Sequence, residues 1–494
     1  MRLYFVVATI FGGTPMEKVR TRFAPSPTGF MHLGGLRTAL YAYLYAKKHN
    51  GDFILRIEDT DQERFVEGAI DVIYSSLNES GLHYDEGPDI GGPYGPYVQS
   101  ERKSIYMEYA KKLIELGGAY YCFCTKERLE SLTDENGNRK YDKHCLSLSK
   151  EEIEAKLKAG EPYVIRQNIP KEGVGSYIDL VYGKIEVNYA DLEDNILIKS
   201  DGMPTYNFAN VVDDHLMKIS HVIRGTEYLS STPKYNLMYD AFGWERPQYI
   251  HLPTIMKDAT RKLSKRYGDA NFDDFLNKGY LKEAIINYVA LLGWAPKNNV
   301  EKMTLAEMVE LFDLDGVSKS QSIFDDMKLR WLNGEYIKDM SNEDFYKVAM
   351  PFFEKSSVCG KYNDKLILDL MKTRIEILSE IPDKIAFLDN FGAYDVSIFV
   401  HKKSKTDIEL CKKVLPLIKD ALANLTTFDF NSIHDALMKV ATENQLKNSQ
   451  VFWPARVAVS GQEVTPGGAI ELAEILGKDE TLKRIDFSID LLNK

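Results

Sequence analysis

Arg22–Thr38 reads RFAPSPTGFMHLGGLRT, and this stretch decides how the N-terminal part of the chain folds. Pro25 and Pro27 push the residues before them out of the helical region, so the stretch begins as an extended segment. Gly34 and Gly35 then let backbone approach a ligand closely. Apolar residues follow at helical spacing, at Leu36, Leu40, Tyr43 and Leu44. The pattern predicts a strand, a turn and a helix.

His32 falls in the predicted turn between that strand and that helix. Free backbone N–H groups and the positive end of a helix attract phosphate. A second string, KLSKR at Lys262–Arg266, places Lys262 and Lys265 on either side of Ser264. Two mobile cations at this spacing can hold the outer phosphates of ATP. Each string alone is more often a plain turn or a solvated face, so the pair of strings carries the interpretation.

Length and composition indicate a protein of several domains. The chain has 494 residues, of which 44% are hydrophobic and 27% charged, and no apolar run is long enough to span a bilayer. The net charge of −11 does not indicate a nucleic-acid binder. Such a partner would have to be held by local basic patches, such as HKKSK at His401–Lys405.

The cysteines and the first residues bear on the cell compartment. Five sparse cysteines, an odd number, argue against a disulfide framework and favour a reducing cytosol. The first residues, MRLYFVVATIFGG, are similar to a short signal peptide. We interpret residues 1–16 instead as an extended start with no assigned role and Met16 as the natural start, because Met16 stands just before the Arg22–Thr38 stretch.

Strand and helix patterns divide the remaining chain. Short apolar runs alternate with helical periods in residues 17–100 and again from about 201, which predicts a parallel α/β sheet. Residues 101–200 interrupt the alternation with a helix, further strands and a charged loop, and we interpret them as an α+β insertion. Toward the C-terminus helical periods dominate, as in LKEAIINYVALLGW and DKLILDLMKTRIEIL.

The two phosphate-handling strings together resemble the HIGH and KMSKS signatures of class I aminoacyl-tRNA synthetases. Further segments narrow the resemblance to glutamyl-tRNA synthetase of bacterial type, from about Lys18 to the C-terminus. These segments are LRIEDTD (Leu55–Asp61), DGMPTYNFANVVDDHLM (Asp201–Met217), VIRGTE (Val222–Glu227) and LLGWAP (Leu291–Pro296). A chain of this length is unlike the short tRNA-modifying paralogue and unlike small nucleotidyltransferases. A silent RNA-binding paralogue would be expected to lack His32 or a KLSKR lysine.

The resemblance implies a domain order. The expected parts are a Rossmann catalytic domain in two halves (17–100 and 201–258), an inserted tRNA acceptor-end-binding domain (101–200), a stem-contact region with the KLSKR loop (259–340) and an all-helical anticodon-binding domain (341–494). The family is expected to be monomeric.

The resemblance also implies the reaction. L-Glutamate attacks the α-phosphate of ATP, giving a glutamyl-adenylate and pyrophosphate, and the glutamyl group then passes to tRNA with release of AMP. His32, Lys262 and Lys265 are the expected catalytic residues, and Mg²⁺ would screen the phosphates. The expected ATP-binding residues are His32, Gly34, Gly35, Glu227, Lys262, Ser264 and Lys265. Gly35 stands where the general signature has a second histidine.

Glutamate has to be held at both ends. A buried guanidinium pairs bidentately with a carboxylate in a way that a neutral amide cannot match. The residues that the resemblance places in the glutamate pocket are Arg22, Ala24, Ser26, Glu58, Tyr206, Asn210 and Arg224. Glu58 is expected to face the α-ammonium group, and Arg224 to separate glutamate from glutamine. Outside the motifs, Glu58 would be interpreted as part of a helix cap and Tyr206 as core.

Two further sites are expected, one for a metal and one for the anticodon. Three ligands of a tetrahedral zinc site would be Cys122, Cys124 and Cys145, with Tyr141 or His144 completing it. Buried reduced cysteines without metal are the alternative. Arg374, in MKTRIEIL, aligns with an arginine that some relatives use to recognise the third anticodon base; a plain helix-surface arginine is the alternative. The enzyme is expected to favour glutamate tRNA over glutamine tRNA.

Overall fold

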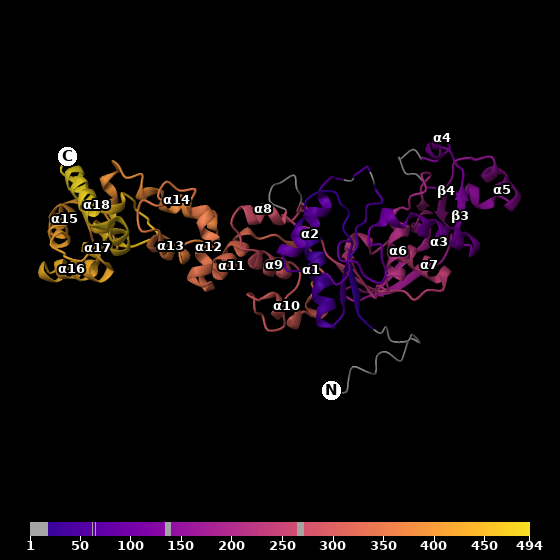
Figure 1. Cartoon of the computed structure of the whole chain (residues 1–494), viewed down its shortest axis with the longest axis horizontal. Coiled ribbons are helices and arrows are strands. Elements are labelled where there is room, and N and C mark those ends of the chain that lie inside the picture. Colours follow the sequence, from indigo (N-terminus) through magenta and orange to yellow (C-terminus); the bar gives the residue numbers. More distant parts are fainter. Residues whose placement is uncertain (1–17, 62, 65, 134–139, 264–270) are drawn as a thin grey trace, which may run out of the picture. The chain divides into compact units, whose positions relative to one another are not determined.

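A computed structural model describes residues 18–61, 63, 64, 66–133, 140–263 and 271–494. The chain forms two compact units. Figure 1 shows the whole chain in colours that follow the residue number. The first comprises the described residues up to Phe275 together with Ile285–Asp325, and the second comprises Leu276–Ala284 and Asp326–Lys494. Each unit has its own core and is described by itself.

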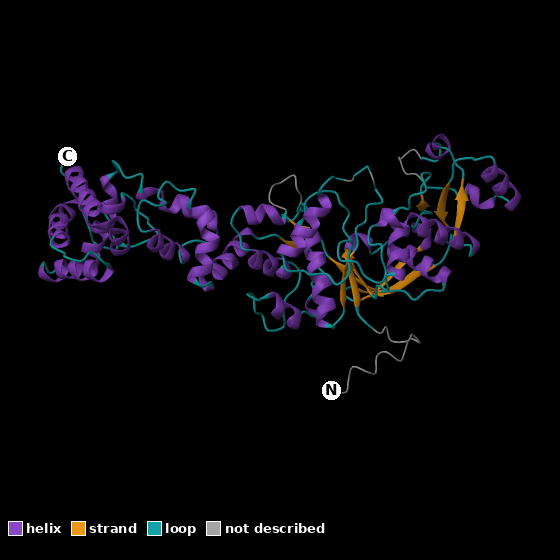
Figure 2. Ribbon diagram, in the orientation of Figure 1, coloured by secondary structure: helices purple, strands orange, loops and turns teal. Residues whose placement is uncertain are grey.

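A parallel sheet forms the centre of the first unit (Figure 2). Two parallel pairs build it, β1 (Arg20–Phe23) with β2 (Asp52–Leu55) and β8 (His221–Gly225) with β9 (Gln248–Leu252). The pairs meet at β1 and β8, where the backbone N–H of Ser220 donates to the carbonyl of Arg20 at 2.9 Å. Two further strands extend the sheet beyond β9, namely β5 (Val174–Asp179), parallel to it, and β6 (Gly183–Asn188), antiparallel to β5.

The helix predicted after the first strand is present as α1 (Leu33–Lys48). Its periodic leucines Leu36, Leu40 and Leu44 are fully buried against the sheet. The other helices beside this sheet are α2 (Ala69–Glu79), α6 (Tyr206–Leu216) and α7 (Thr232–Phe242), which ends at Gly243 in the left-handed conformation that glycine adopts freely.

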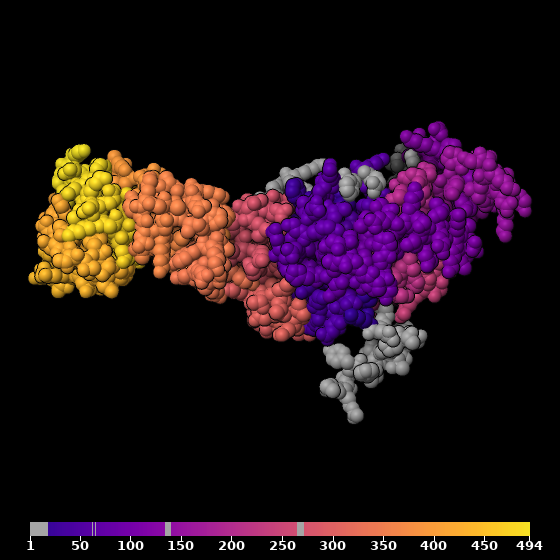
Figure 3. Space-filling view, viewed as in Figure 1, coloured from indigo at the N-terminus to yellow at the C-terminus, as the bar shows by residue number. Residues whose placement is uncertain are grey.

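The insertion forms an antiparallel sheet of β3 (Ala119–Cys122), β4 (Val164–Gln167) and β7 (Ile196–Ile198). Its helices are α3 (Lys103–Glu115), α4 (Lys126–Glu130) and α5 (Lys150–Lys158). The strand β7 pairs with β4, and its Leu197 and Ile198 are buried against α3 and α6. In Figure 3 these purple residues form one end of the first unit.

The rest of the first unit consists of short elements. They are β10 (Ile255–Met256), parallel to β11 (Ser322–Ile323), and α10 (Leu305–Leu311); α8 (Phe272–Asn277) and α9 (Lys282–Leu291) run across the division between the units. No helix among the described residues is long and apolar enough to cross a membrane.

The second unit is helical throughout its described residues. Its helices are α11 (Asp326–Asp339), α12 (Asn342–Phe353), α13 (Asp364–Lys372), α14 (Ile381–Ile385), α15 (Ile408–Ala423), α16 (Phe430–Glu443), α17 (Asn448–Ser460) and α18 (Ala469–Leu492), which is kinked at Gly477. One apolar core runs through them. The periodic stretch that begins with α13 was expected to stay helical past Arg374. The helix ends earlier because Asn333 and Gly279 take up backbone groups of Glu376 and Leu378.

Candidate active site

A cavity of about 450 Å³ opens where β1, β2 and β8 end. Ligands of open α/β sheets bind at this edge, outside the carboxyl ends of the strands. Of the residues expected to bind glutamate or ATP, those that line the cavity are Arg22, Ala24, Ser26, Gly35, Glu58, Tyr206, Arg224 and Glu227. Further lining residues, which sequence reasoning missed, include Thr38, Thr60, Asp61 and Tyr228.

Arg22 lines the cavity and forms an ion pair with Asp214. Its Nε and Nη2 donate to the two carboxylate oxygens of Asp214 at 2.9 and 3.2 Å, and both side chains are almost fully buried. Asp214 also accepts from Arg56 at 2.7 Å. Burial opposes ionisation of Asp214, yet the guanidinium groups of Arg22 and Arg56 outweigh it and hold the pKa of this carboxyl below its usual value. Arg22 therefore brings hydrogen-bond donors to the cavity with its charge largely compensated.

Glu58 is a buried carboxylate in the same cavity lining. It accepts from Arg56 Nη2 at 2.9 Å. Burial raises the pKa of Glu58 above its usual value, and the positive charges of Arg56 and Arg22 only partly offset this. A cationic group in the cavity would stabilise the ionised form of Glu58.

Arg224 is held differently from Arg22. It is the last residue but one of β8 and is 6% exposed. Its Nε and Nη2 donate to neutral acceptors, His251 Nε2 at 3.2 Å and Thr232 Oγ1 at 2.7 Å. Its guanidinium also lies 4.9 Å from the ring centres of Tyr228 and Tyr235. No described carboxylate forms an ion pair with Arg224. A buried cation without a counter-charge is costly, so this wall of the cavity favours an anionic ligand.

His32 is the N-cap of α1. Its Nδ1 accepts from the backbone N–H of Gly34 at 3.1 Å, which leaves Nε2 as the protonated nitrogen of the neutral ring. His32 and Gly34 are not among the residues that line the cavity, although Gly35 of the same turn is. The start of α1 thus combines an imidazole with backbone N–H groups, which are the kinds of group that bind phosphate.

Four other expected site residues have different outcomes. Asn210 is buried on α6, and its side chain donates to the carbonyl of Tyr206 one turn earlier, so it does not reach the cavity lining. Lys262 is exposed and pairs with Met256 in an isolated antiparallel bridge. Ser264 and Lys265 lie outside the described residues.

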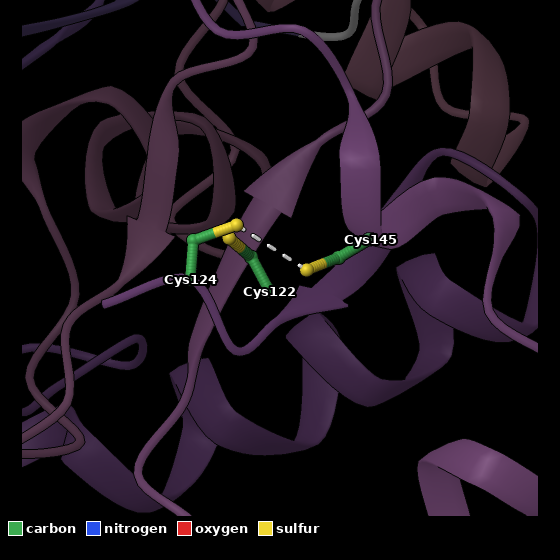
Figure 4. A group of neighbouring side chains, drawn as sticks. All are labelled: Cys122, Cys124 and Cys145. Atoms are coloured by element: carbon green, nitrogen blue, oxygen red, sulfur yellow. Dashed lines mark hydrogen bonds between the residues drawn. The ribbon is translucent and has the colours of Figure 1, made fainter. Parts of the chain in front are cut away.

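Three thiols meet at the end of β3 (Figure 4). The Sγ atoms of Cys122, Cys124 and Cys145 lie within 4.8 Å of one another, and all three cysteines are free. The Tyr141 hydroxyl lies 3.3 Å from Cys122 Sγ and 3.5 Å from Cys124 Sγ. Zn–S bonds of about 2.3 Å place tetrahedral sulfurs about 3.8 Å apart, so the four atoms fit a zinc site.

The surroundings of the thiols also suit a metal. Burial opposes ionisation of Cys122, but hydrogen bonds from Tyr141 and Arg166 help to lower the pKa of its thiol, and thiolate is the form that binds metal. Arg166 Nε donates to Cys122 Sγ at 3.3 Å. His144, the other proposed fourth ligand, is exposed and does not belong to the cluster.

The helical unit has a cavity of its own, of about 510 Å³, and Arg374 lines it. Arg374 is exposed in the loop after α13 and not on a helix surface. The loop after α17 supplies Gln462, Val464, Thr465 and Pro466 to the same cavity. Val464 is 83% exposed, which is unusual for an apolar side chain in a cavity wall.

The basic segment His401–Lys405 is an ordered turn of the same unit. His401 and Thr406 bond to each other through their backbones, and the His401 ring stacks on Trp453 of α17 at 3.7 Å and 4°. Arg456 lies on Trp453 at 4.5 Å from the ring centre and donates to Thr465, a residue of the cavity. The exposed side chains that the turn presents are Lys402, Lys403 and Lys405.

Comparisons with known families agree with this geometry. The family described as "tRNA synthetases class I (E and Q), catalytic domain" matches residues 18–331, and the family described as "Anticodon binding domain" matches residues 328–489. The glutamate–tRNA ligase of Clostridium kluyveri is 58% identical over 486 residues, which cover 97% of this chain and 99% of that one. That of Clostridium tetani is 57% identical over 480 residues, 96% of this chain and 98% of the other.

Solved structures give the same result. The structure of a glutamate tRNA ligase from Elizabethkingia meningosepticum, in complex with its amino acid, has a TM-score of 0.87 and 37% identity to this chain. The match covers 96% of this chain and 99% of that one.

Proposed function

The chain belongs to the class I glutamate–tRNA ligases, and on that premise we propose which of its residues carry out the ligation. The reaction is the ATP-dependent joining of L-glutamate to its tRNA through glutamyl-adenylate. The expected Rossmann-type sheet and helical anticodon-binding region are both present.

Glutamate is bound in the 450 Å³ cavity between Glu58 and the two arginines. Arg224 carries the proposal, because it is a buried cation whose side chain donates to the neutral acceptors His251 and Thr232. It takes a substrate carboxylate, Glu58 faces the α-ammonium group, and Arg22 adds oriented donors. A γ-amide would leave the charge of Arg224 unmatched, at a cost of several kcal/mol. Binding alone can therefore reject glutamine.

ATP lies against the turn that starts α1. His32 donates from Nε2 to the α-phosphate as negative charge grows on it, and the start of α1 favours the same charge. Gly34 and Gly35 allow the phosphates to approach, and Glu227 lies near the nucleoside. Lys262, Ser264 and Lys265 follow the departing pyrophosphate. Mg²⁺, the usual companion of ATP in this reaction, would screen the negative charge of the phosphate oxygens when it is bound.

ATP–pyrophosphate exchange with glutamate, measured with and without tRNA, tests the assignment. Exchange that depends on glutamate and fails with glutamine supports it. Absence of exchange under both conditions would contradict the activity itself, whereas equal exchange with glutamine would contradict only the glutamate site.

The three thiols and Tyr141 bind one structural zinc ion, which shapes the insertion that holds the tRNA acceptor end. Zinc binding needs reduced thiolates, which agrees with the cytosolic location that we propose. Elemental analysis of protein purified without chelator should find about one zinc per chain. Cys122→Ser should lose it and His144→Ala should keep it. Zinc-free wild-type protein would mean that the cysteines are merely buried thiols.

The helical unit binds the anticodon arm of the tRNA. Arg374 in its cavity offers a planar fork to a base edge, and the exposed Val464 offers apolar surface to an unstacked base. The lysine turn at His401–Lys405 supplies backbone phosphate contacts, although the net charge of the chain is −11. Replacing Lys402 and Lys403 by Ala should weaken tRNA binding and reduce its salt dependence by about two phosphate contacts.

A further inference from the structure

A buried hydrogen-bond chain leads from Arg224 to two residues that do not line the cavity, His251 and Asp179. Arg224 Nε donates to His251 Nε2 at 3.2 Å, and His251 Nδ1 lies 2.7 Å from Asp179 Oδ2. Arg224, His251 and Asp179 stand on three neighbouring strands, β8, β9 and β5. Their exposed fractions are 6%, 0% and 1%. Neither His251 nor Asp179 lines the cavity, so neither can touch the substrate there.

The chemistry of these groups fixes where the histidine proton lies. A carboxylate only accepts hydrogen bonds, so His251 Nδ1 has to be the protonated nitrogen. Nε2 then carries a lone pair and can accept from Arg224. Asp179 is itself held in place, because it also accepts from the backbone of His251 at 3.1 Å and from Val181 and Tyr182 at 2.9 and 2.8 Å.

The histidine differs from a carboxylate in one respect that matters for the ligand. Asp214 orients Arg22 and also neutralises it. His251 orients Arg224 as a neutral acceptor, so the full charge of the guanidinium is kept for a ligand. Burial lowers the pKa of His251, and the nearby charge of Arg224 acts in the same direction against the opposing effect of Asp179. The ring therefore stays neutral beside the arginine.

We propose that His251 and Asp179 are positioning residues for Arg224. Asp179 selects the Nδ1–H tautomer of His251, and the bare Nε2 of that tautomer orients the guanidinium without neutralising it. The proposal rests on the proposed function, in which Arg224 holds a carboxylate of glutamate.

The test compares variants that keep or remove the acceptor. His251→Leu removes it, whereas His251→Gln keeps a carbonyl oxygen that can accept from Arg224. Glutamate KM and kcat are measured by ATP–pyrophosphate exchange with tRNA present, and thermal unfolding is followed in parallel. We expect His251→Leu to raise the glutamate KM about tenfold with little change in the ATP KM. In His251→Gln the glutamate KM should stay within about threefold of the wild-type value.

His221 provides a matched control. Like His251 it is a buried histidine of the central sheet, but it lies on β8 and is 6% exposed. Its ring contacts Ser220 and Tyr45 and not Arg224. His221→Leu should lower the unfolding temperature and leave the glutamate KM unchanged. An equal rise of the glutamate KM in both leucine variants would overturn the proposal, because loss of general stability would then explain it.

A double-mutant cycle separates this proposal from the assignment of the pocket. In an Arg224→Ala background, His251→Leu should change the glutamate KM less than twofold, because no guanidinium remains to be oriented. If the two substitutions instead raised the glutamate KM by factors that multiply in the double variant, the positioning role would be overturned. The assignment of Arg224 to the glutamate site would still stand. An unchanged glutamate KM in Arg224→Ala alone would instead refute the proposed glutamate site.

The tautomer itself can be observed. Asp179→Asn places an amide donor opposite His251 Nδ1, so the ring proton should move to Nε2 and oppose the N–H of Arg224. We expect Asp179→Asn to raise the glutamate KM at least as much as His251→Leu does. Solution NMR of wild-type enzyme with ¹⁵N-labelled histidine should report the Nδ1–H form for His251. An Nε2–H form in the wild type would refute the mechanism.

Discussion

The two cavities of the molecule are similar in size and opposite in construction. In the catalytic cavity, of about 450 Å³, the three charged groups proposed to hold glutamate are almost fully buried, with Arg22 and Glu58 4% exposed and Arg224 6%. The cavity of the helical unit, of about 510 Å³, is lined by the exposed Arg374 and the exposed Val464. A small zwitterion offers few atoms, so selecting it takes strong interactions that are shielded from water. A nucleotide base offers a wide face and edge, and weaker exposed contacts are enough.

Arg224→Ala is the change that should affect the catalytic cavity most. It removes the one cation there that no described carboxylate compensates, and kcat/KM for glutamate should fall on the order of a thousandfold. The gap between glutamate and glutamine should narrow. Exchange kinetics with both amino acids measure the effect. A glutamate preference that survives intact would show that the buried charges do not select the substrate.

His32→Ala should have the next largest effect and should separate chemistry from binding. In the proposed mechanism its side chain donates to phosphate as charge develops in the transition state, and loss of one such donor costs about a hundredfold in rate. Pre-steady-state measurement of adenylate formation should show this fall with a nearly unchanged glutamate affinity. A rise of the glutamate KM with an unchanged rate would remove His32 from the chemistry.

Mild acid should distinguish the two units, because the catalytic unit buries histidines beside its sheet. Burial lowers the pKa of His221 to about 4, against about 6.5 in an unfolded chain. The stability that neutral His221 provides is therefore present above pH 6.5 and is lost as the pH falls towards 4. The cost is about 2 kcal/mol at pH 5.

Hydrogen exchange can follow this acid effect in each unit. Protection of β8 should fall between pH 6.5 and 5 in the wild type and should change less in His221→Gln. Exchange in α15 of the helical unit serves as the internal reference. Equal loss of protection in wild type and variant would show that His221 is not the responsible group.

Arg374→Ala should have the smallest effect of these changes, and the effect should be confined to the reaction with tRNA. Loss of one base-edge contact lowers kcat/KM for glutamate tRNA about tenfold, while the glutamate KM in the exchange reaction stays as it is. Arg374→Lys is the informative companion, because it keeps the charge and loses the planar fork. If lysine restores full activity, the cavity recognises phosphate charge and not a base.

The sequence predicted the elements that local rules control. The prolines and glycines of Arg22–Thr38 and the periodic leucines after them specify β1, the turn and α1, and these are confirmed. The motif residues at strand ends lie together because carboxyl ends of parallel strands share one edge of the sheet. The motif did not indicate the hydrogen bond of Asn210, whose amide donates to the carbonyl of Tyr206 one turn earlier on the same helix.

What the sequence did not predict depends on long-range strand pairing. Asp214 lies 192 residues from Arg22, and Asp179 lies 72 from His251. No local pattern links either pair. The neighbouring acids Asp213 and Asp214 in VVDDHL were a signal, since two adjacent buried carboxylates need several cations, and Arg22, Arg56 and Arg102 supply them.

The pairing of β5 with β9 has a consequence for protein engineering and for evolution. Residue Asp179 belongs to the inserted stretch between the two halves of the sheet, and yet it joins the strand that carries His251. The insertion is therefore not a cassette that can be exchanged between relatives at its outer borders. If the proposed role of Asp179 holds, a chimera that takes residues 101–200 from a donor has to keep a carboxylate at this position, because His251 would otherwise lose its partner behind Arg224.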